Sequence, residues 1–158
     1  MTWRDATLAD VEEVHRLVRG LAEYEKHLAE FHASPEDFRA WLFGERPAAQ
    51  AMLAEIAGRA VGVCVWYRTF ASFLGRPAIW IEDVFVEPEF RRQGLGRAVF
   101  QHLAARALNE GCAALEWNVL DWNAPAIAAY RAMGAVPRDQ WTDQRVSGQA
   151  LIALAGKG

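Results

Sequence analysis

The sequence has few cysteines and no long apolar run, and each absence excludes a class of protein. Its only two cysteines, Cys64 and Cys112, lie inside apolar runs and lack the paired spacing of a disulfide framework or a zinc site. We therefore expect two buried thiols and no metal. No apolar run approaches the roughly 18 residues that a membrane-spanning helix needs, so we expect no membrane partner.

The chain also lacks a basic excess. Its net charge is -3, whereas proteins that hold nucleic acid by its phosphates usually carry a basic surplus or a basic stripe. No nucleic-acid partner is expected. Near the N-terminus, Arg4, Asp5 and Asp10 stand where a secretory signal peptide would be apolar, which favours a cytoplasmic location.

What the chain does have is enough apolar material for one core. It contains 158 residues, of which 53% are hydrophobic. A chain near this length buries about 70% of its unfolded surface without the help of disulfide bonds or bound metal ions. We therefore predict a single domain over residues 1–158.

Acidic side chains gather in the segment between Asp10 and Asp37. They are Asp10, Glu12, Glu13, Glu23, Glu25, Glu30, Glu36 and Asp37. Such a segment is typical either of a solvated helix face or of a surface that attracts a cation, and the sequence leaves both interpretations open.

Apolar periodicity and turn residues predict ten elements. Thr7 and Asp10 have the form of a capping box before a helix with an apolar stripe, and Ser34 followed by Pro35 marks a second helix start. That second helix should bury Phe38, Trp41 and Leu42. The elements are a strand over 2–6, a helix from 11, a helix from 35, strands over 52–56, 61–67 and 79–86, a helix over 95–110, a strand over 113–119, a helix over 125–133 and a final strand over 151–154. This order predicts an α/β fold in which helices cover both faces of a mixed sheet.

The most informative stretch runs from the strand that ends at Val86 through a loop with Gly94 and Gly96 into the next helix. Amides at a helix start have no intrahelical acceptor and carry the positive end of the helix dipole, so they suit a pyrophosphate. Two glycines and three nearby arginines also fit an ordinary turn. A P-loop is excluded because no Lys-Ser/Thr pair follows the glycines. A dinucleotide-binding fingerprint is also excluded, because this loop lacks the third glycine of that motif.

The run Arg91-Arg92-Gln93-Gly94-Leu95-Gly96 resembles the Q/R-x-x-G-x-G/A signature of the GNAT superfamily of acetyl-CoA-dependent N-acetyltransferases. Its surroundings are similar as well, with Asp83 and Val86 before the signature and Asn123 and Tyr130 after it. The resemblance implies a GNAT-type, mostly antiparallel central sheet with helices on both faces. It also implies direct transfer of acetyl from acetyl-CoA to an amine within a ternary complex.

Several segments resemble more closely the diamine (spermidine/spermine) acetyltransferases and their thialysine-acetylating relatives. They are Leu21-Ala22-Glu23-Tyr24-Glu25, Ile81-Glu82-Asp83-Val84-Phe85-Val86 and Asp121-Trp122-Asn123-Ala124-Pro125. This resemblance implies a small cationic amine as substrate, either a polyamine or a lysine-like amine. Because alanines follow Asn123 where polyamine enzymes carry more acidic residues, the choice between the two stays open.

An acetyltransferase needs a base, because an ammonium group has no lone pair and a primary amine is mostly protonated at pH 7. Glu82 lies in an otherwise apolar strand whose neighbours would desolvate it, and it resembles the family glutamate that receives the proton through water. Tyr130 resembles the tyrosine that protonates the departing thiolate. The alternative, purely structural roles are a solvent-facing carboxylate for Glu82 and a core aromatic for Tyr130.

The resemblance also implies the residues that bind each substrate. Those expected at acetyl-CoA are Val84, Phe85, Val86, Arg91, Arg92, Gln93, Gly94, Leu95, Gly96, Arg97, Asn123, Pro125, Ala126 and Tyr130. Asn123 also reads as a plain helix N-cap. Those expected at the amine are Tyr24, Glu25, Glu82 and Glu116.

Two other functions remain as alternatives. One is acetylation of a protein lysine or N-terminus by the same fold, and the other is a non-catalytic acyl-CoA-binding module. We also expect a homodimer, on the resemblance and because seven tryptophans are many for one small core.

Overall fold

The computed structural model describes residues 2–157, which form two compact units divided after Leu120. The first unit contains the sheet and the second a pair of short helices. The single domain expected from the sequence stays a prediction. Within residues 2–157 we find no helix that is both long and apolar enough to cross a membrane.

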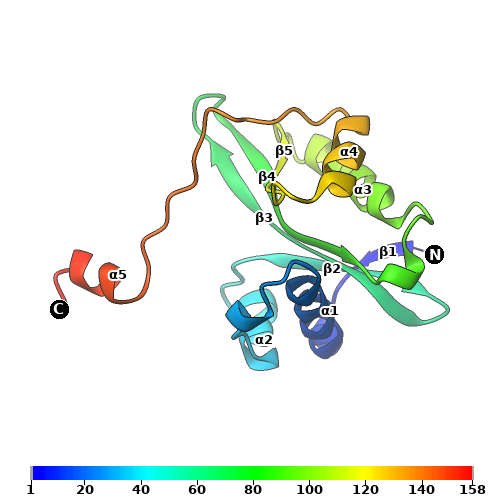
Figure 1. Cartoon of the computed structure of the whole chain (residues 1–158), viewed down its shortest axis with the longest axis horizontal. Helices are drawn as coiled ribbons and strands as arrows, with labels where there is room; N and C mark the ends of the chain where they lie inside the picture. Colours follow the sequence, from blue (N-terminus) through cyan, green and yellow to red (C-terminus); the bar gives the residue numbers. More distant parts are fainter. Residues whose placement is uncertain (1, 158) are drawn as a thin grey trace. The chain divides into compact units, whose positions relative to one another are not determined.

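The first unit is built on a five-stranded sheet in the order β1-β2-β3-β4-β5 (Figure 1). All neighbouring strands are antiparallel except β4 and β5, which are parallel. The strands are β1 (Thr2–Asp5), β2 (Gln50–Ile56), β3 (Arg59–Ala71), β4 (Arg76–Val86) and β5 (Leu115–Trp117).

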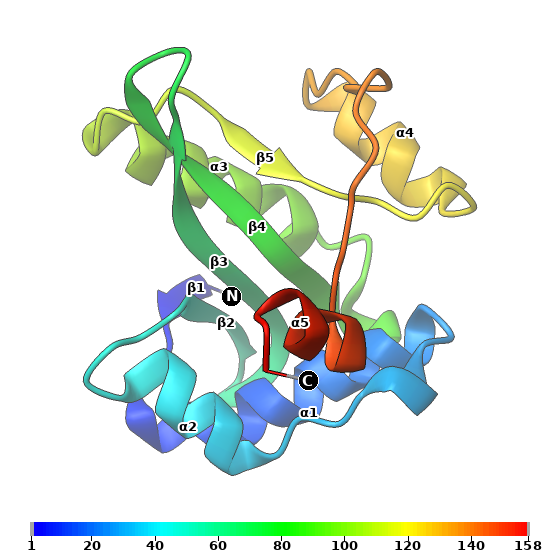
Figure 2. The same ribbon diagram turned by 90° about the vertical axis from the view of Figure 1, so that its left-hand side faces the viewer.

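Three helices cover this sheet, with α1 and α2 on one face and α3 on the other (Figure 2). Their bounds are α1 (Val11–Tyr24), α2 (Pro35–Phe43) and α3 (Leu95–Asn109), with short 3-10 helices at η1 (Leu8–Asp10), η2 (Leu28–Glu30) and η3 (Pro88–Phe90). The predicted capping boxes are present: the Thr7 box begins η1, which runs into α1, and the Ser34 box begins α2. The mixed α/β fold is confirmed.

The core has one layer on each face because β2 and β3 alternate their side chains. On the α1 face the buried layer joins Val14, Leu17 and Leu21 to Leu53, Val63, Val65 and Phe85. On the α3 face it joins Ala54, Val61, Val86 and Leu95. A Cβ on Gly20 of α1 would lie 3.0 Å from the Phe85 ring, so any larger residue there would force the ring to shift.

A bulge interrupts β4 at the centre of the sheet. Val65 pairs with Asp83 and Trp66 pairs with Ile81, so Glu82 is the extra residue with no partner on β3. The parallel pairing between β4 and β5 also ends there, at Ile81 and Trp117. The second half of β4 therefore keeps only β3 as a ladder partner.

The second unit contains α4 (Ala124–Ala132) and α5 (Gly148–Leu154). The strand predicted over 151–154 is wrong, because these residues form α5. The segment is rich in Ala, Leu and Gln, which favour a helix, and no strand of its own unit lies beside it to supply ladder bonds. The bond from the Ala155 amide to the Leu151 carbonyl, 3.0 Å long, is of the helical type.

Three smaller expectations are also corrected. The strand predicted over 113–119 shrinks to β5 because its pairing stops at the β4 bulge. The β3–β4 hairpin extends further than expected, with β3 reaching Ala71. Trp41 is 60% exposed, whereas Phe38 and Leu42 pack against the core as predicted. Both cysteines are buried, which confirms that expectation.

Candidate active site

The start of α3 offers a row of free backbone donors. Its first helical bond runs from the Ala98 amide to the Gly94 carbonyl, 2.9 Å away, so the amides of Leu95, Gly96 and Arg97 precede the ladder. Gly94 has φ +83°, a left-handed value that suits glycine. A Cβ built on Gly94 or Gly96 would meet no atom of the rest of the described chain within 4 Å, so open space surrounds both glycines at the start of α3.

A buried ion-pair cluster holds the segment that leads from β4 into this loop. The Glu87 carboxylate accepts a hydrogen bond from Arg16 of α1 at 2.6 Å and one from Arg59 of β3 at 2.8 Å. The Glu87 amide donates to the Val61 carbonyl at 2.9 Å. Because Glu87 is 9% exposed and fully paired, the crossover is anchored where it leaves the sheet.

The β4 bulge places two consecutive carboxylates in different surroundings. Glu82 is exposed, and its carboxylate accepts hydrogen bonds from Trp80 Nε1 at 2.9 Å and from the Tyr67 hydroxyl at 3.3 Å. Burial raises the pKa of Tyr67, and the neighbouring Glu82 charge raises it further. Tyr67 and Trp80 therefore orient the Glu82 carboxylate from one side.

The sequence predicted that apolar neighbours would desolvate Glu82, but in the structure the desolvated carboxyl group is that of Asp83. It pairs with Val65, whose side chain belongs to the α1 face, so Asp83 lies on that face too. Burial raises the pKa of Asp83 to about 7, and the charges of Glu82 and Glu25 raise it as well.

Glu25 directly follows α1 and completes a group of three carboxylates, which we call the acidic cluster: Glu25, Glu82 and Asp83. Burial also raises the pKa of Glu25. The charges of Glu82 and Glu25 disfavour the ionisation of Asp83, so a bound cation such as an ammonium group would stabilise the charged form of this cluster. Glu116, predicted at the amine, lies on β5 opposite Trp80 in the parallel pairing.

Tyr24 stands at the end of α1 beside this cluster in sequence. The Arg91 guanidinium lies over its ring, with Cζ 4.4 Å from the ring centroid, and also near the Phe85 ring at 5.6 Å. Arg92 and Arg97 are both exposed, next to the amides at the start of α3. Arg92 has φ +60°, which a non-glycine residue adopts at a cost of about 1 kcal/mol.

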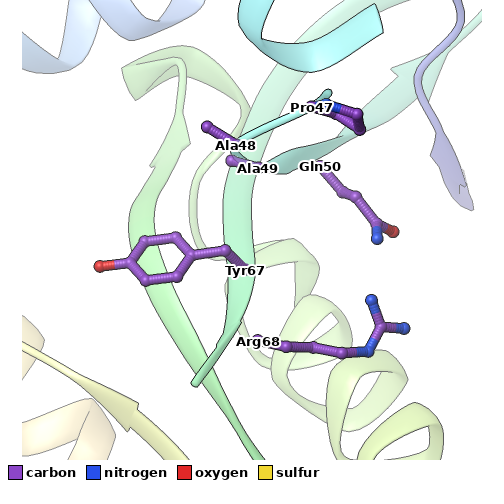
Figure 3. Close-up of a pocket in the computed structure, with 6 residues that line it drawn as sticks. All are labelled: Pro47, Ala48, Ala49, Gln50, Tyr67 and Arg68. Carbon is purple, nitrogen blue, oxygen red and sulfur yellow. The ribbon is translucent and has the colours of Figure 1, made fainter. Parts of the chain in front are cut away.

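A hollow of about 230 Å³ opens at the edge of β3 beyond its pairing with β2 (Figure 3). It is lined by Pro47, Ala48, Ala49, Gln50, Tyr67 and Arg68. The Tyr67 and Arg68 side chains point to opposite sides of the strand (Figure 3). No site residue predicted from the sequence lines this hollow, and only Tyr67 connects it to the bulge, through Glu82.

The second unit holds the remaining predicted residues. Asn123 is the N-cap of α4, with its side-chain oxygen 3.4 Å from the Ala126 amide, and Pro125 lies in the first turn. Tyr130 lies on the same helix and is partly buried. Glu82 thus belongs to the first unit and Tyr130 to the second, so the structure gives no distance between these two side chains.

Sequence reasoning missed Asp83, Tyr67 and Trp80 as site residues. The available signal was the Glu82-Asp83 pair itself, since two adjacent carboxylates in an apolar strand break the two-residue alternation and indicate a bulge. Within residues 2–157, no group of three or more His, Cys, Asp or Glu side chains is placed to hold a metal ion.

The fourth strand of the central sheet bulges at two carboxylates and then leads through a glycine loop into a helix start with free amides, an arrangement that suits an acyl-transferring enzyme. The family comparison makes this specific: the chain belongs to the acetyltransferase (GNAT) family, whose model matches residues 12–135. The enzyme class predicted from the sequence is confirmed, and the protein is an N-acetyltransferase.

Relatives with known activities cover nearly the whole chain. A bovine (Bos taurus) thialysine N-epsilon-acetyltransferase is 39% identical over 98% of this chain and 96% of its own length. An L-ornithine N5-acetyltransferase from Arabidopsis thaliana is 26% identical over 96% of this chain and 86% of its own. Among solved structures, an integron cassette protein from the mobile metagenome of V. cholerae superposes with a TM-score of 0.82 at 22% identity, covering 98% of this chain and 96% of that one. This last likeness concerns the fold.

Proposed function

We propose that the protein transfers the acetyl group of acetyl-CoA to a primary amine of a small cationic substrate, directly and within a ternary complex. The observation that carries the proposal is the placement of two complementary charge sites along β4 and its continuation. The acidic cluster at the bulge suits an ammonium group, and the start of α3 suits a pyrophosphate. Relatives that act on thialysine and ornithine support a lysine-like amine, and a spermidine/spermine-like relative supports a polyamine.

The residues at the start of α3 fit the pyrophosphate of acetyl-CoA. The amides of Leu95, Gly96 and Arg97 face open space because neither glycine carries a side chain there. The exposed guanidinium groups of Arg92 and Arg97 add positive charge. Acetyl-CoA supplies the activated acetyl group, and the second half of β4, which lacks a β5 partner beyond Ile81, leaves a free edge for the arm that carries it.

Glu82 is the proposed base. The attacking nitrogen must first lose a proton, and Glu82 is exposed and oriented by Trp80 and Tyr67, so it accepts that proton through a water molecule. Asp83 assists, because a carboxyl group with a pKa of about 7 exchanges protons readily at neutral pH. The neutral nitrogen then attacks the thioester carbonyl, whose developing oxyanion is stabilised by an amide of β4 near Val84–Val86.

Tyr130 is the proposed acid. When the carbon–sulfur bond breaks, the nitrogen releases its remaining extra proton to solvent, and the thiolate takes a proton from the Tyr130 hydroxyl, which then regains a proton from solvent. A phenol with a pKa near 10 is a suitable donor to a thiolate near 8.5. The resemblance to the family supports this role for Tyr130, and it assigns Asn123, Pro125 and Ala126 of the same helix to the pantetheine arm.

A substrate panel tests the proposal. Purified protein is mixed with acetyl-CoA and, separately, free polyamines, lysine analogues and peptides, and the release of CoA thiol is followed. Turnover with free amines is expected. Turnover with peptides alone would support a protein acetyltransferase, and CoA binding without any turnover would support a non-catalytic module.

A homodimer and a cytoplasmic location also belong to the proposal. The dimer is supported by exposed aromatic side chains, since Trp41, Trp122 and Trp141 are 60%, 49% and 63% exposed. Light scattering at micromolar concentration tests it, and a monomeric mass would reject it.

A further inference from the structure

The two hydrogen bonds that Glu82 accepts end on the same carboxylate oxygen. Trp80 donates its indole Nε1–H to Oε2 at 2.9 Å, and the Tyr67 hydroxyl donates to the same Oε2 at 3.3 Å. Within residues 2–157 no donor contacts the other oxygen, Oε1. A carboxylate oxygen offers two lone pairs, so Oε2 is fully used by the protein and Oε1 is left for another partner.

The register of the sheet explains why these three side chains meet. Tyr67 of β3 pairs with Trp80 of β4, so their side chains lie on the same face. Glu82 follows Trp80 by two residues, which is the spacing of side chains along one face of a strand. Because Glu82 is the extra residue of the bulge, no β3 residue stands opposite it, and its carboxylate reaches the Tyr67–Trp80 pair.

Both donors keep their protons at neutral and mildly alkaline pH. An indole Nε1–H acts only as a donor. Burial raises the pKa of Tyr67, and the charge of Glu82 raises it further, so its hydroxyl stays a donor as well. The other titratable groups on the neighbouring elements are acidic, namely Asp83 on β4, Glu25 after α1 and Glu116 on β5. The two neutral donors are therefore what fixes the carboxylate.

We propose that Trp80 and Tyr67 are positioning residues that hold Glu82 by Oε2 and so assign the proton of the acceptor amine to Oε1. This inference rests on the proposed function and specifies its base to the atom. The ammonium group gives one proton to a water molecule, and that water gives one of its own protons to Oε1. The nitrogen keeps the electron pair of the broken N–H bond for its attack, and Glu82 later returns the proton to solvent.

Two conservative variants remove the donors and keep the aromatic rings. They are Trp80→Phe and Tyr67→Phe, each made alone and together with Glu82→Gln. With thialysine, L-ornithine and spermidine as acceptors, kcat/KM for the amine and KM for acetyl-CoA are measured at pH 7 and pH 9.5. Circular dichroism confirms that each variant folds.

We expect Trp80→Phe to lower kcat/KM at pH 7 by about 5- to 30-fold, in the range of one hydrogen bond to a charged group at a partly exposed site. Tyr67→Phe should cost about 2- to 5-fold, because its bond is longer. Both losses should shrink at pH 9.5, where more of the amine is already neutral. KM for acetyl-CoA should stay within about twofold, since neither side chain belongs to the α3 start.

The double variants separate positioning from a general packing role. Glutamine at position 82 cannot take the proton, so its orientation no longer matters to the reaction. Adding Trp80→Phe to Glu82→Gln should therefore cost less than about twofold. Trp41→Phe, at a tryptophan of α2 that is 60% exposed, is the matched control and should leave kcat/KM unchanged.

Nuclear magnetic resonance tests the hydrogen bond without any turnover. The indole ¹⁵N–¹H signal of Trp80 is identified as the one that Trp80→Phe removes. In Glu82→Gln this signal should move upfield, because a charged acceptor is replaced by a neutral, weaker one. The indole signal that Trp41→Phe removes should stay in place.

The inference is overturned if Trp80→Phe slows the reaction by the same factor in the wild-type and Glu82→Gln backgrounds, or equally at both pH values. It is also overturned if the indole signal of Trp80 ignores Glu82→Gln. Should no amine be turned over, the proposed function fails, and the indole signal alone decides. A shift on Glu82→Gln would then support the positioning of this carboxylate by Trp80, and an unchanged signal would reject it.

Discussion

The bulge of β4 and the start of α3 present opposite charges, and they do so by different means. At the start of α3 the positive potential comes from backbone amides and needs glycines to expose it. At the bulge the negative potential comes from three side chains supplied by α1 and β4. The first site is therefore local in sequence, whereas the second depends on how helix and sheet pack together.

The largest effect is expected from a residue that belongs to neither region. If Tyr130 protonates the leaving thiolate, Tyr130→Phe should lower kcat by about 10²- to 10⁴-fold, because that is the usual worth of general acid catalysis. Binding at both charge sites should survive. Rapid-quench kinetics and calorimetry with acetyl-CoA check this, and an unchanged kcat with chemistry rate-limiting would remove Tyr130 from the mechanism.

Glu82→Gln, at the acidic cluster, should lower the acetylation rate by a factor that depends on pH. Without the base, the enzyme relies on amine that is already neutral, and the neutral fraction rises steeply as pH approaches the amine pKa near 10. We expect a loss of about 10²- to 10³-fold at pH 7 that shrinks at pH 9.5. An equal loss at both pH values would mark Glu82 as a structural carboxylate and move the base to another group.

The same contrast explains what the sequence could predict. The signature from Arg91 to Gly96 is readable because a left-handed turn and open amides demand glycine at fixed positions, and the order of most elements follows from periodicity. The exposure of Glu82 and the burial of Asp83 were not readable. They depend on a one-residue register shift between β3 and β4, which moves each later side chain of β4 to the other face.

The course of Arg91 and the end of the chain show the same limit. The signature identifies Arg91 as part of the loop, but its position over Tyr24 depends on how α1 packs against the sheet. The segment over 151–154 has an apolar pattern that is too short to separate strand from helix, and local hydrogen bonds decided for the helix.

Gly94→Val tests the glycine-dependent side of the comparison. A β-branched residue at φ +83° is strained, and its side chain would stand where the amides face open space. Affinity for acetyl-CoA should fall by about 10- to 100-fold, whereas the affinity for the amine should change little. Calorimetry on the folded variant measures both, and Gly111→Val, at a left-handed position that ends α3 away from its start, is the matched control for strain alone.

The smallest effect concerns stability and the sign of its pH dependence at the acidic cluster. The pKa of Asp83 is about 7 in the folded protein, above its ordinary value of 3.8, so between these values the folded state binds more protons than the unfolded state. The contribution of Asp83 to stability is therefore fully present below pH 3.8 and is lost progressively as pH rises from there to about 7.

Asp83→Asn removes that loss, because asparagine does not ionise. The advantage of the variant over wild type should grow by about 1–2 kcal/mol between pH 5 and pH 8, as measured by urea unfolding. Asp10→Asn is expected to change stability in the opposite direction. Two hydrogen bonds from Arg4 at 2.8 Å hold the pKa of Asp10 well below its usual range. Its stabilisation is present at neutral pH and is lost only in acid, so Asp10→Asn should be less stable than wild type at pH 7. A difference between Asp83→Asn and wild type that does not grow from pH 5 to pH 8 would show that this carboxyl group is not desolvated by the packing of α1 against β4.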